Sequence, residues 1–248
     1  MIPTQPLVGK SALVTGGARR VGRGIALTLA EAGADVVLTY RSSQAEAVET
    51  AREIESLGRR ALAVECDVRS EASVRSAVAA AAGRFGRLDL LVNNAAIFES
   101  APLDSLTLEQ WDAVFETNAR GPFLVAREAL TALRASKTRE GRIVNIGSLG
   151  GMKAWAGHAH YCASKAALHM LTQAMAKAFA PEISVNCVAP GWIEMDETHS
   201  GQSAHFAAKT PMRRNGSVDD VAQAVLFFAA GPHFVTGQVL AVDGGLGL

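Results

Sequence analysis

Short hydrophobic runs alternate along the chain with longer segments in which hydrophobic residues recur at helical spacing. The short runs are bounded by glycine or polar residues and predict seven β-strands, whereas the longer, alanine-rich segments predict helices between them. The predicted strands cover residues 11–15, 35–40, 60–65, 88–92, 142–146, 184–188 and 239–242. The predicted helices cover residues 21–32, 43–57, 71–84, 108–133, 160–179 and 218–228.

This alternation is typical of successive βαβ units and predicts an α/β fold. We expect a doubly wound, seven-stranded, mostly parallel sheet with helices on both faces. Of the 248 residues, 49% are hydrophobic and 19% are charged, which is enough apolar mass to bury such a sheet on both sides. The sequence shows neither a second domain nor a long linker, so we expect residues 1–248 to form a single domain.

One segment, from about residue 193 to residue 211, is polar and has no clear period. It contains Glu194, Asp196 and Glu197 among small residues. Loops of this length are often functional lids, so we interpret it as a substrate loop that moves over a site. An ordinary surface loop is the alternative.

The charge balance and the cysteines restrict the partners and the compartment. The 24 basic residues equal the 24 acidic ones, so no overall field attracts nucleic acid or an acidic membrane. Cys66, Cys162 and Cys187 lack CxxC spacing and are interpreted as buried thiols in a reducing compartment. Residues 1–8 lack a signal-peptide pattern, and no hydrophobic run reaches the ~18 residues of a membrane span. We therefore expect a cytoplasmic protein without a nucleic-acid or membrane partner.

A glycine-rich turn, Thr15-Gly16-Gly17-Ala18-Arg19-Arg20-Val21-Gly22, joins the first predicted strand to the first predicted helix. Small residues there allow the backbone to approach a pyrophosphate, whose charge a helix N-terminus stabilises. A tight turn without any ligand would need the same glycines and is the alternative interpretation.

Tyr161 and Lys165 are four residues apart in a predicted helix, so their side chains share one face. A nearby ammonium, together with a positive nicotinamide ring, would stabilise the phenolate of a tyrosine whose ordinary pKa is ~10. Ser148 follows the fifth predicted strand, thirteen residues before Tyr161. An interface tyrosine and a capping serine are the alternative interpretations of these two residues.

The motifs together resemble a known family. The glycine turn, Asn93-Asn94-Ala95-Ala96, Ser148, Tyr161-Cys162-Ala163-Ser164-Lys165 and Pro190-Gly191 occur in the order and spacing of classical short-chain dehydrogenases, from about residue 10 to residue 245. The resemblance implies a Rossmann-type fold and four catalytic residues, which are Asn118, Ser148, Tyr161 and Lys165. In that family the tyrosine gives a proton to a carbonyl oxygen while hydride reaches the carbon, the serine holds the oxygen, and the asparagine organises a water relay through the lysine.

The resemblance also locates the cofactor. An NAD enzyme of this kind carries a carboxylate after the second strand, whereas this chain has Tyr40-Arg41-Ser42-Ser43 there and Arg19 in the glycine turn. Guanidinium groups suit a 2′-phosphate, so we expect NADP(H), with solvated surface arginines as the alternative. Asp67-Val68 are implied to touch the adenine, and Pro190, Gly191 and Ile193 the nicotinamide carboxamide. The full set of implied cofactor contacts is Gly16, Arg19, Arg20, Val21, Gly22, Tyr40, Arg41, Ser42, Asp67, Val68, Asn93, Ala95, Tyr161, Lys165, Pro190, Gly191 and Ile193.

We expect substrate contacts from Phe98, Trp155 and Trp192 and from the segment after Ile193, with a small carbonyl compound or alcohol as the partner. His158 and His160 have no third ligand near them in the sequence, so we interpret them as polar loop residues and expect no metal.

Three residues depart from the commonest family pattern: Arg20 in the turn, Ala96 in place of a glycine, and Met195 in place of a threonine. Arg20 and Phe98 resemble features of the pteridine reductases within the family. Those enzymes usually carry aspartate where this chain has Ser148, and serine favours reduction of a ketone such as a 3-oxoacyl thioester. Dihydropterin reduction is the runner-up. A non-catalytic NADP sensor is the third hypothesis, and it would need no proton donor such as Tyr161.

Related enzymes are often tetramers joined through paired helices, which correspond here to residues 108–133 and 160–179. These segments carry additional hydrophobic residues, including Phe123, Leu124, Met170 and Leu171. We expect a homotetramer.

Overall fold

Seven parallel strands form one sheet in the order β3-β2-β1-β4-β5-β6-β7. The structure, a computed structural model, describes residues 5–136, 140–195 and 201–248. The strands are β1 (Ser11–Val14), β2 (Asp35–Tyr40), β3 (Ala61–Glu65), β4 (Leu90–Asn93), β5 (Gly141–Ile146), β6 (Ile183–Pro190) and β7 (Val239–Val242). The predicted α/β fold is confirmed, and the strand order reverses between β1 and β4, which is where such sheets bind ligands.

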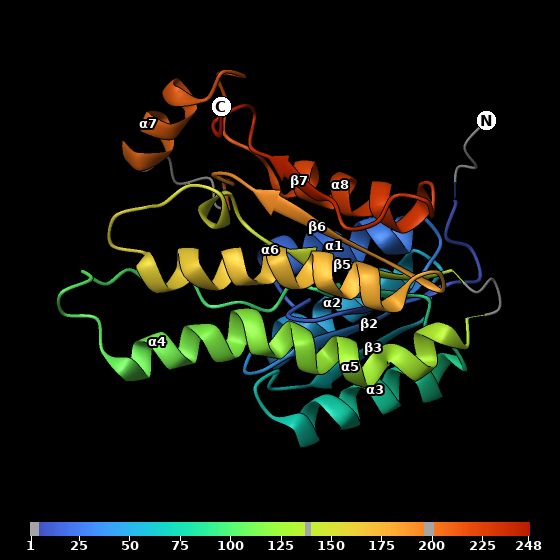
Figure 1. Ribbon diagram of the computed structural model, residues 1–248. Coiled ribbons are helices and arrows are strands. Elements are labelled where there is room, and N and C mark those ends of the chain that lie inside the picture. The colour runs from blue at the N-terminus through green and yellow to red at the C-terminus, as the bar shows by residue number, and fades with distance from the viewer. Residues whose placement is uncertain (1–4, 137–139, 196–200) are drawn as a thin grey trace.

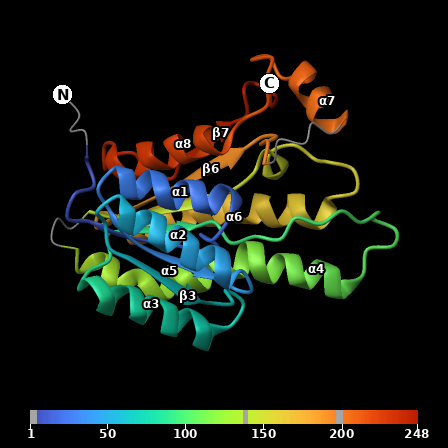
Figure 2. The same ribbon diagram turned by 180° about the vertical axis from the view of Figure 1, so that it is seen from behind.

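Helices cover both faces of the sheet (Figures 1 and 2). They are α1 (Arg20–Glu31), α2 (Gln44–Ser56), α3 (Glu71–Phe85), α4 (Leu108–Phe115), α5 (Gly121–Arg134), α6 (Ala159–Phe179), α7 (Gly201–Lys209) and α8 (Val218–Ala230). Neighbouring residues of β1 point to opposite faces of the sheet. Val14 belongs to the core cluster formed with α1 and α8, whereas Leu13 belongs to the one formed with α3 and α5. This alternation explains why successive residues of the central strands are apolar on both faces.

The predicted helix over residues 108–133 is interrupted. A π-helical turn, η1 (Glu116–Arg120), separates α4 from α5, and it contains Asn118. Pro122 lies in the first turn of α5, where its missing N–H is tolerated. The prediction of one continuous helix was therefore wrong, and the irregular turn occurs at one of the candidate catalytic residues, as π-turns frequently do.

The segment over residues 193–211 was expected to be a loop, and it contains the helix α7 instead. Residues 196–200, with Asp196 and Glu197, lie outside the described residues. The ring of Phe206 on α7 stacks on Trp192 at a centroid distance of 4.2 Å. A helix this short depends on packing for its stability, which explains why periodicity did not reveal it.

Some expectations about burial need correction. Cys66 and Cys187 are buried, but Cys162 is partly exposed. Of the residues expected to form additional apolar surface, Leu124 is buried and Leu171 packs against the core, so only Phe123 and Met170 are exposed. Within the described part of the chain, no helix is both long enough and apolar enough to cross a membrane.

Candidate active site

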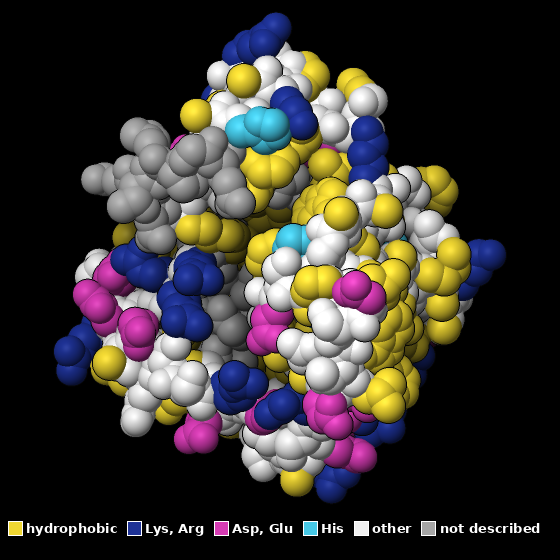
Figure 3. Space-filling view, turned by 90° about the vertical axis from the view of Figure 1, so that its left-hand side faces the viewer, with side chains coloured by type: hydrophobic (Ala, Val, Ile, Leu, Met, Phe, Trp, Pro, Cys, Tyr) yellow, Lys and Arg dark blue, Asp and Glu magenta, His cyan; other side chains and the backbone are white. Residues whose placement is uncertain are grey.

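The candidate site lies at the carboxyl edge of the sheet, around the point where the strand order reverses. Figure 3 looks onto this edge and shows a hollowed face, with Lys and Arg side chains along one side of the hollow and hydrophobic side chains around the rest. Parallel strands bring the residues that follow them to the same edge. Residues far apart in the chain, from the turn after β1 to the segment after β6, therefore meet here.

Tyr161, Lys165 and Ser148 lie together at this edge. Tyr161 and Lys165 occupy successive turns of α6, and the Lys165 Nζ is 5.8 Å from the centroid of the Tyr161 ring. Ser148 directly precedes the short helix η2 (Leu149–Gly151), its hydroxyl accepts the N–H of Gly150, and it lies close enough to Tyr161 to act on the pKa of the phenol. The structure thus assembles a phenol and a hydroxyl that can face one substrate oxygen.

Burial shifts the pKa values of both Tyr161 and Lys165. Burial raises the pKa of Tyr161 above its ordinary value of 10.0, while the hydrogen bond with Ser148 acts in the opposite direction. Burial also lowers the pKa of Lys165 to about 8, and its Nζ donates to the Ile146 carbonyl at 2.8 Å. Burial thus sets the direction of the Tyr161 pKa shift, and stabilisation of the phenolate by Lys165 stays a prediction for the step that follows proton transfer. Tyr161 is a neutral phenol, which suits a proton donor.

Asn118 connects the η1 turn to the two segments beside it. Its Oδ1 accepts the Ile97 N–H at 2.8 Å, and its Nδ2 donates to the Ile97 carbonyl at 2.9 Å and to the Ser164 Oγ at 3.1 Å. The contact of Asn118 with α6 is thus made to Ser164, the residue before Lys165. Asn118 holds the loop after β4, and with it the adjacent Phe98, against α6.

The glycine turn leaves a helix N-terminus open to an anion. A Cβ on Gly22 would lie 2.1 Å from the Gly16 carbonyl oxygen, so the turn can close only with glycine there. Arg19 is the N-cap of α1 and makes no side-chain capping bond, so the first N–H groups of α1 remain available. Arg20 is exposed and adopts a left-handed φ of 51°. The tight backbone of the turn and the available N–H donors of α1 both suit a diphosphate.

The Asn93-Asn94-Ala95 segment supports this turn. Asn94 Nδ2 donates to the Thr15 and Gly16 carbonyls, each at 3.0 Å, and the Ala95 N–H donates to Thr15 Oγ1. The Asn93 side chain is buried and donates to Asn145 Oδ1 at 2.9 Å. Because its side chain is engaged in this way, Asn93 could contact a cofactor only through its main chain. Asn94, which was not among the predicted site residues, shapes the turn directly.

A second uncapped helix N-terminus lies at the end of β2. Ser43 is the N-cap of α2 and makes no side-chain capping bond, and Arg41 and Ser42 beside it are exposed. Among the described residues, the guanidinium groups of Arg19 and Arg41 have no hydrogen bond or ion pair. The uncapped α2 N-terminus and the exposed Arg41 close to it could therefore bind a phosphate.

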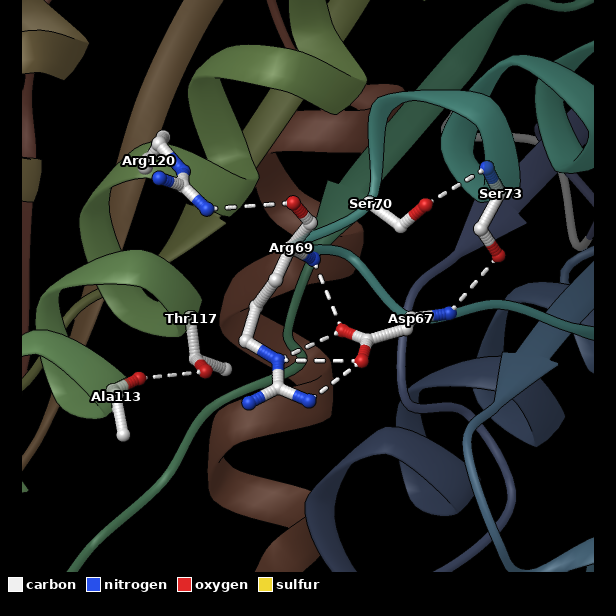
Figure 4. Close-up of polar contacts among 7 residues, drawn as sticks. All are labelled: Asp67, Arg69, Ser70, Ser73, Ala113, Thr117 and Arg120. Carbon is white, nitrogen blue, oxygen red and sulfur yellow. Dashed lines mark hydrogen bonds and ion pairs between the residues drawn. The ribbon is translucent and has the colours of Figure 1, made fainter. Parts of the chain in front are cut away.

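Asp67 is already engaged by a partner that the sequence did not reveal. Arg69 binds its carboxylate through Nη2 at 2.6 Å and through Nε at 3.0 and 3.1 Å (Figure 4). The hydrogen bond from Arg69 is the main cause of the lowered pKa of Asp67, and the charge of Arg41 contributes. Val68 is buried, with its side chain beside Gly121. Asp67 therefore remains ionised and oriented between the ends of β2 and β3.

The segment after β6 runs along the opposite side of the hollow. β6 ends at Pro190, Gly191 packs closely on Asp243, and Ile193 forms an isolated bridge with Gly216. Tyr40 and Val21 are partly buried and pack against the core beside the glycine turn.

Two aromatic rings lie beside the ring of Tyr161. Phe98 is 57% exposed, stacks on His158 at 4.8 Å and meets Tyr161 edge-on at 4.8 Å, and Trp155 stacks on Tyr161 at 6.2 Å. Trp192 contacts Phe206 instead. Sequence reasoning missed His158 and Phe206 as neighbours of the substrate residues, and only the proximity of His158 to Tyr161 in the chain could have indicated the first.

His160 was interpreted as a polar loop residue, and this interpretation was wrong. It lies in α6, is fully buried, and neither ring nitrogen has a hydrogen-bond partner. His158 precedes the helix as its N-cap. Within residues 5–136, 140–195 and 201–248, no three His, Cys, Asp or Glu side chains form a group that could hold a metal ion.

Comparisons with known proteins agree over nearly the whole chain. A family model described as enoyl-(acyl carrier protein) reductase matches residues 16–247. A 3-oxoacyl-(acyl-carrier-protein) reductase of Synechocystis is 37% identical over 97% of this chain and 98% of its own length. The short-chain dehydrogenase/reductase FrzI of Cladobotryum is also 37% identical, with 99% of each chain covered.

Two solved structures with bound cofactor are similar as well. A short-chain dehydrogenase from Burkholderia cenocepacia in complex with NADP has a TM-score of 0.91 and 40% identity, and the match covers 98% of this chain and 100% of that one. A blue fluorescent protein from a metagenomic library in complex with NADPH has a TM-score of 0.89 and 40% identity, covering 98% of this chain and 99% of that one.

Proposed function

This chain belongs to the short-chain dehydrogenase/reductase family, and we propose that it is an NADP(H)-dependent oxidoreductase that interconverts a carbonyl compound and a secondary alcohol. The observation that carries the proposal is the convergence of Ser148, Tyr161 and Lys165 beside an open glycine turn. A non-catalytic sensor would have no use for the buried phenol–serine pair.

The residues of the chain divide the chemistry among them. When bound, the reduced nicotinamide supplies a hydride to the carbonyl carbon. Ser148 holds the carbonyl oxygen by a hydrogen bond, and the neutral phenol of Tyr161 transfers its proton to that oxygen as the alcohol forms. Lys165 then provides a positive charge that stabilises the phenolate left behind, and a proton from solvent restores the phenol. In the oxidation direction the same groups act in reverse.

For the cofactor, we assign the diphosphate to the glycine turn and the N-terminus of α1, with Gly16, Arg20, Val21 and Gly22 around it. The uncapped N-terminus of α2, with Arg19, Arg41 and Ser42, supports a site for the 2′-phosphate of NADP(H). NADP and NADPH are the molecules bound in the two solved relatives. The remaining proposed contacts are Tyr40, Asp67 and Val68 toward the adenosine, and Asn93, Ala95, Tyr161, Lys165, Pro190, Gly191 and Ile193 toward the nicotinamide riboside.

For the substrate, we propose a ketone of the 3-oxoacyl-thioester kind. Ser148 beside Tyr161 offers two donors to one oxygen, and relatives of similar length are named 3-oxoacyl-(acyl-carrier-protein) reductases. Phe98 and Trp155 line the approach to Tyr161. Reduction of a dihydropterin is the second candidate, because the half-exposed Phe98 ring, stacked on His158, offers a surface for a flat heterocycle.

A substrate panel tests this proposal. We expect NADPH consumption to be fastest with an acetoacetyl thioester, slower with dihydrobiopterin, and slowest with a crotonyl thioester, which presents a carbon–carbon double bond rather than a ketone. Steady-state kcat/KM for each substrate at constant NADPH measures the preference. A preference for dihydrobiopterin would overturn the ketone proposal, and turnover of none of the three would contradict this substrate class as a whole.

We further predict a homotetramer joined through α4, α5 and α6, where Phe123 and Met170 are 41% and 63% exposed. Light scattering is expected to give a mass of about 104 kDa, which is four chains of 26.0 kDa. Phe123→Glu is expected to lower this mass, because a charge in an apolar interface is costly. Val48→Glu, at a site on α2 that is 38% exposed, is the matched control. A mass near that of one chain for the unmodified protein would contradict the prediction.

A further inference from the structure

A third side chain of α6 lies on the same face as Tyr161 and Lys165. His169 follows Lys165 by four residues, so the three side chains lie one above another along the helix. His169 is 8% exposed and belongs to none of the roles assigned so far. Its ring faces the β5–η2 segment that carries Ser148.

The contact between His169 and this segment is specific. The Ser148 main-chain N–H donates to His169 Nε2 at a distance of 3.4 Å. A Cβ on Gly147 would lie 2.3 Å from His169 Nε2, and a Cβ on Gly151 would lie 2.6 Å from His169 Cε1. The imidazole therefore occupies the space that side chains at these two glycines would need, directly behind Ser148.

The same segment is held a second time from α6. The Lys165 Nζ donates to the carbonyl of Ile146, two residues before Ser148. Lys165 and His169 thus bind the main chain on either side of Gly147, one as a donor and one as an acceptor. The Ser148 hydroxyl, which accepts the Gly150 N–H and lies beside Tyr161, moves with this main chain.

We propose that His169 is a positioning residue for Ser148: its neutral imidazole accepts the Ser148 N–H at Nε2 and keeps the serine hydroxyl aligned with the phenol of Tyr161. The proposal rests on the proposed function, in which Ser148 holds the reacting oxygen. Accepting at Nε2 requires the ring to be neutral, with its proton on Nδ1. Burial and the nearby Lys165 lower the pKa of His169 to about 4, so the neutral form is the one present at neutral pH. The Cys187 thiol faces Gly147 from β6, and burial raises its pKa to about 12, so it adds no charge there.

The test is a double-mutant cycle with two replacements of His169. His169→Leu removes the acceptor, whereas the amide oxygen of His169→Gln reaches about as far as Nε2 and can still accept. We expect His169→Leu to lower kcat about tenfold, the upper end of what one hydrogen bond supplies, with NADPH affinity unchanged. His169→Gln is expected to stay within about threefold of the unmodified enzyme.

The cycle is completed in the Ser148→Ala background, because a residue that acts through Ser148 has no further effect once that hydroxyl is gone. We expect His169→Leu to change kcat there by less than about twofold. An equal loss in both backgrounds would overturn the proposal, since it would indicate a general packing role, and so would an unchanged kcat for His169→Leu alone. If Ser148→Ala is as active as the unmodified enzyme, it is the proposed function that fails. Thermal unfolding of each variant verifies the fold, and His169→Met replaces His169→Leu if the leucine variant does not fold.

Discussion

Replacing Tyr161 by phenylalanine is expected to lower turnover of a ketone by at least ~10²-fold, the scale of lost general acid catalysis. This loss corresponds to about 2.7 kcal/mol of transition-state stabilisation. The phenol lies close enough to Ser148 for the serine to act on its pKa, and burial keeps it protonated. Phenylalanine preserves the ring that Phe98 and Trp155 contact, so the substitution removes the proton and little else.

Single-turnover and steady-state rates with NADPH and a ketone measure this effect, and fluorescence titration of NADPH verifies that the cofactor still binds. The loss is expected in kcat rather than in the affinity for NADPH. Near-normal turnover by a folded Tyr161→Phe protein would show that another group donates the proton. The thermal unfolding midpoint of the variant separates lost catalysis from lost folding.

Replacing Arg41 by alanine is expected to weaken NADPH binding by about tenfold to a hundredfold while NADH binding changes little. A charge-assisted contact to a phosphate is worth roughly 1.5 to 3 kcal/mol, and each ~1.4 kcal/mol corresponds to one decade in affinity. Arg41 is exposed beside the uncapped N-terminus of α2, and it has no ion-pair partner among the described residues. Ser42 and Arg19 retain part of the phosphate site, which limits the loss.

Titration of both cofactors against the unmodified and variant proteins checks this prediction. Arg52→Ala is the matched control, because it removes an exposed arginine within α2, away from the N-terminus of that helix. Equal weakening of NADPH and NADH would make Arg41 a general structural residue. A preference of the unmodified enzyme for NADH would contradict the assignment of NADP(H) itself.

The local pattern of the sequence was sufficient for the sheet. The central strands are largely apolar runs that are buried on both faces, and the runs that predicted β2 and β7 coincide with the strands observed. The pairing of Tyr161 with Lys165 was also readable, because residues four apart on a helix share a face whatever surrounds them. The glycine turn, with Arg19 in it, and Arg41 could be placed at the ends of the first and second strands, because each directly follows a predicted strand.

What the sequence could not indicate were the contacts between segments that only the folded chain brings together. The ring of Phe206 on the helix α7 stacks on Trp192. At the π-turn, Asn118 makes hydrogen bonds both to Ile97 in the loop after β4 and to Ser164 on α6. Arg69 forms an ion pair with Asp67, and burial raises the pKa of the Tyr161 phenol.

The same division applies to the serine. Ser148 could be selected from its spacing to Tyr161, but its main-chain partner His169 lies 21 residues away, on a helix whose neighbour is known only from the fold. The sequence by itself therefore determined the strands, most of the helices, the fold class and the identity of the candidate reactive groups, because these follow from local periodicity and residue chemistry. The tertiary structure alone decided which of these groups are buried, which are already bonded, and what holds each in place, because burial and hydrogen bonding depend on partners distant in the chain.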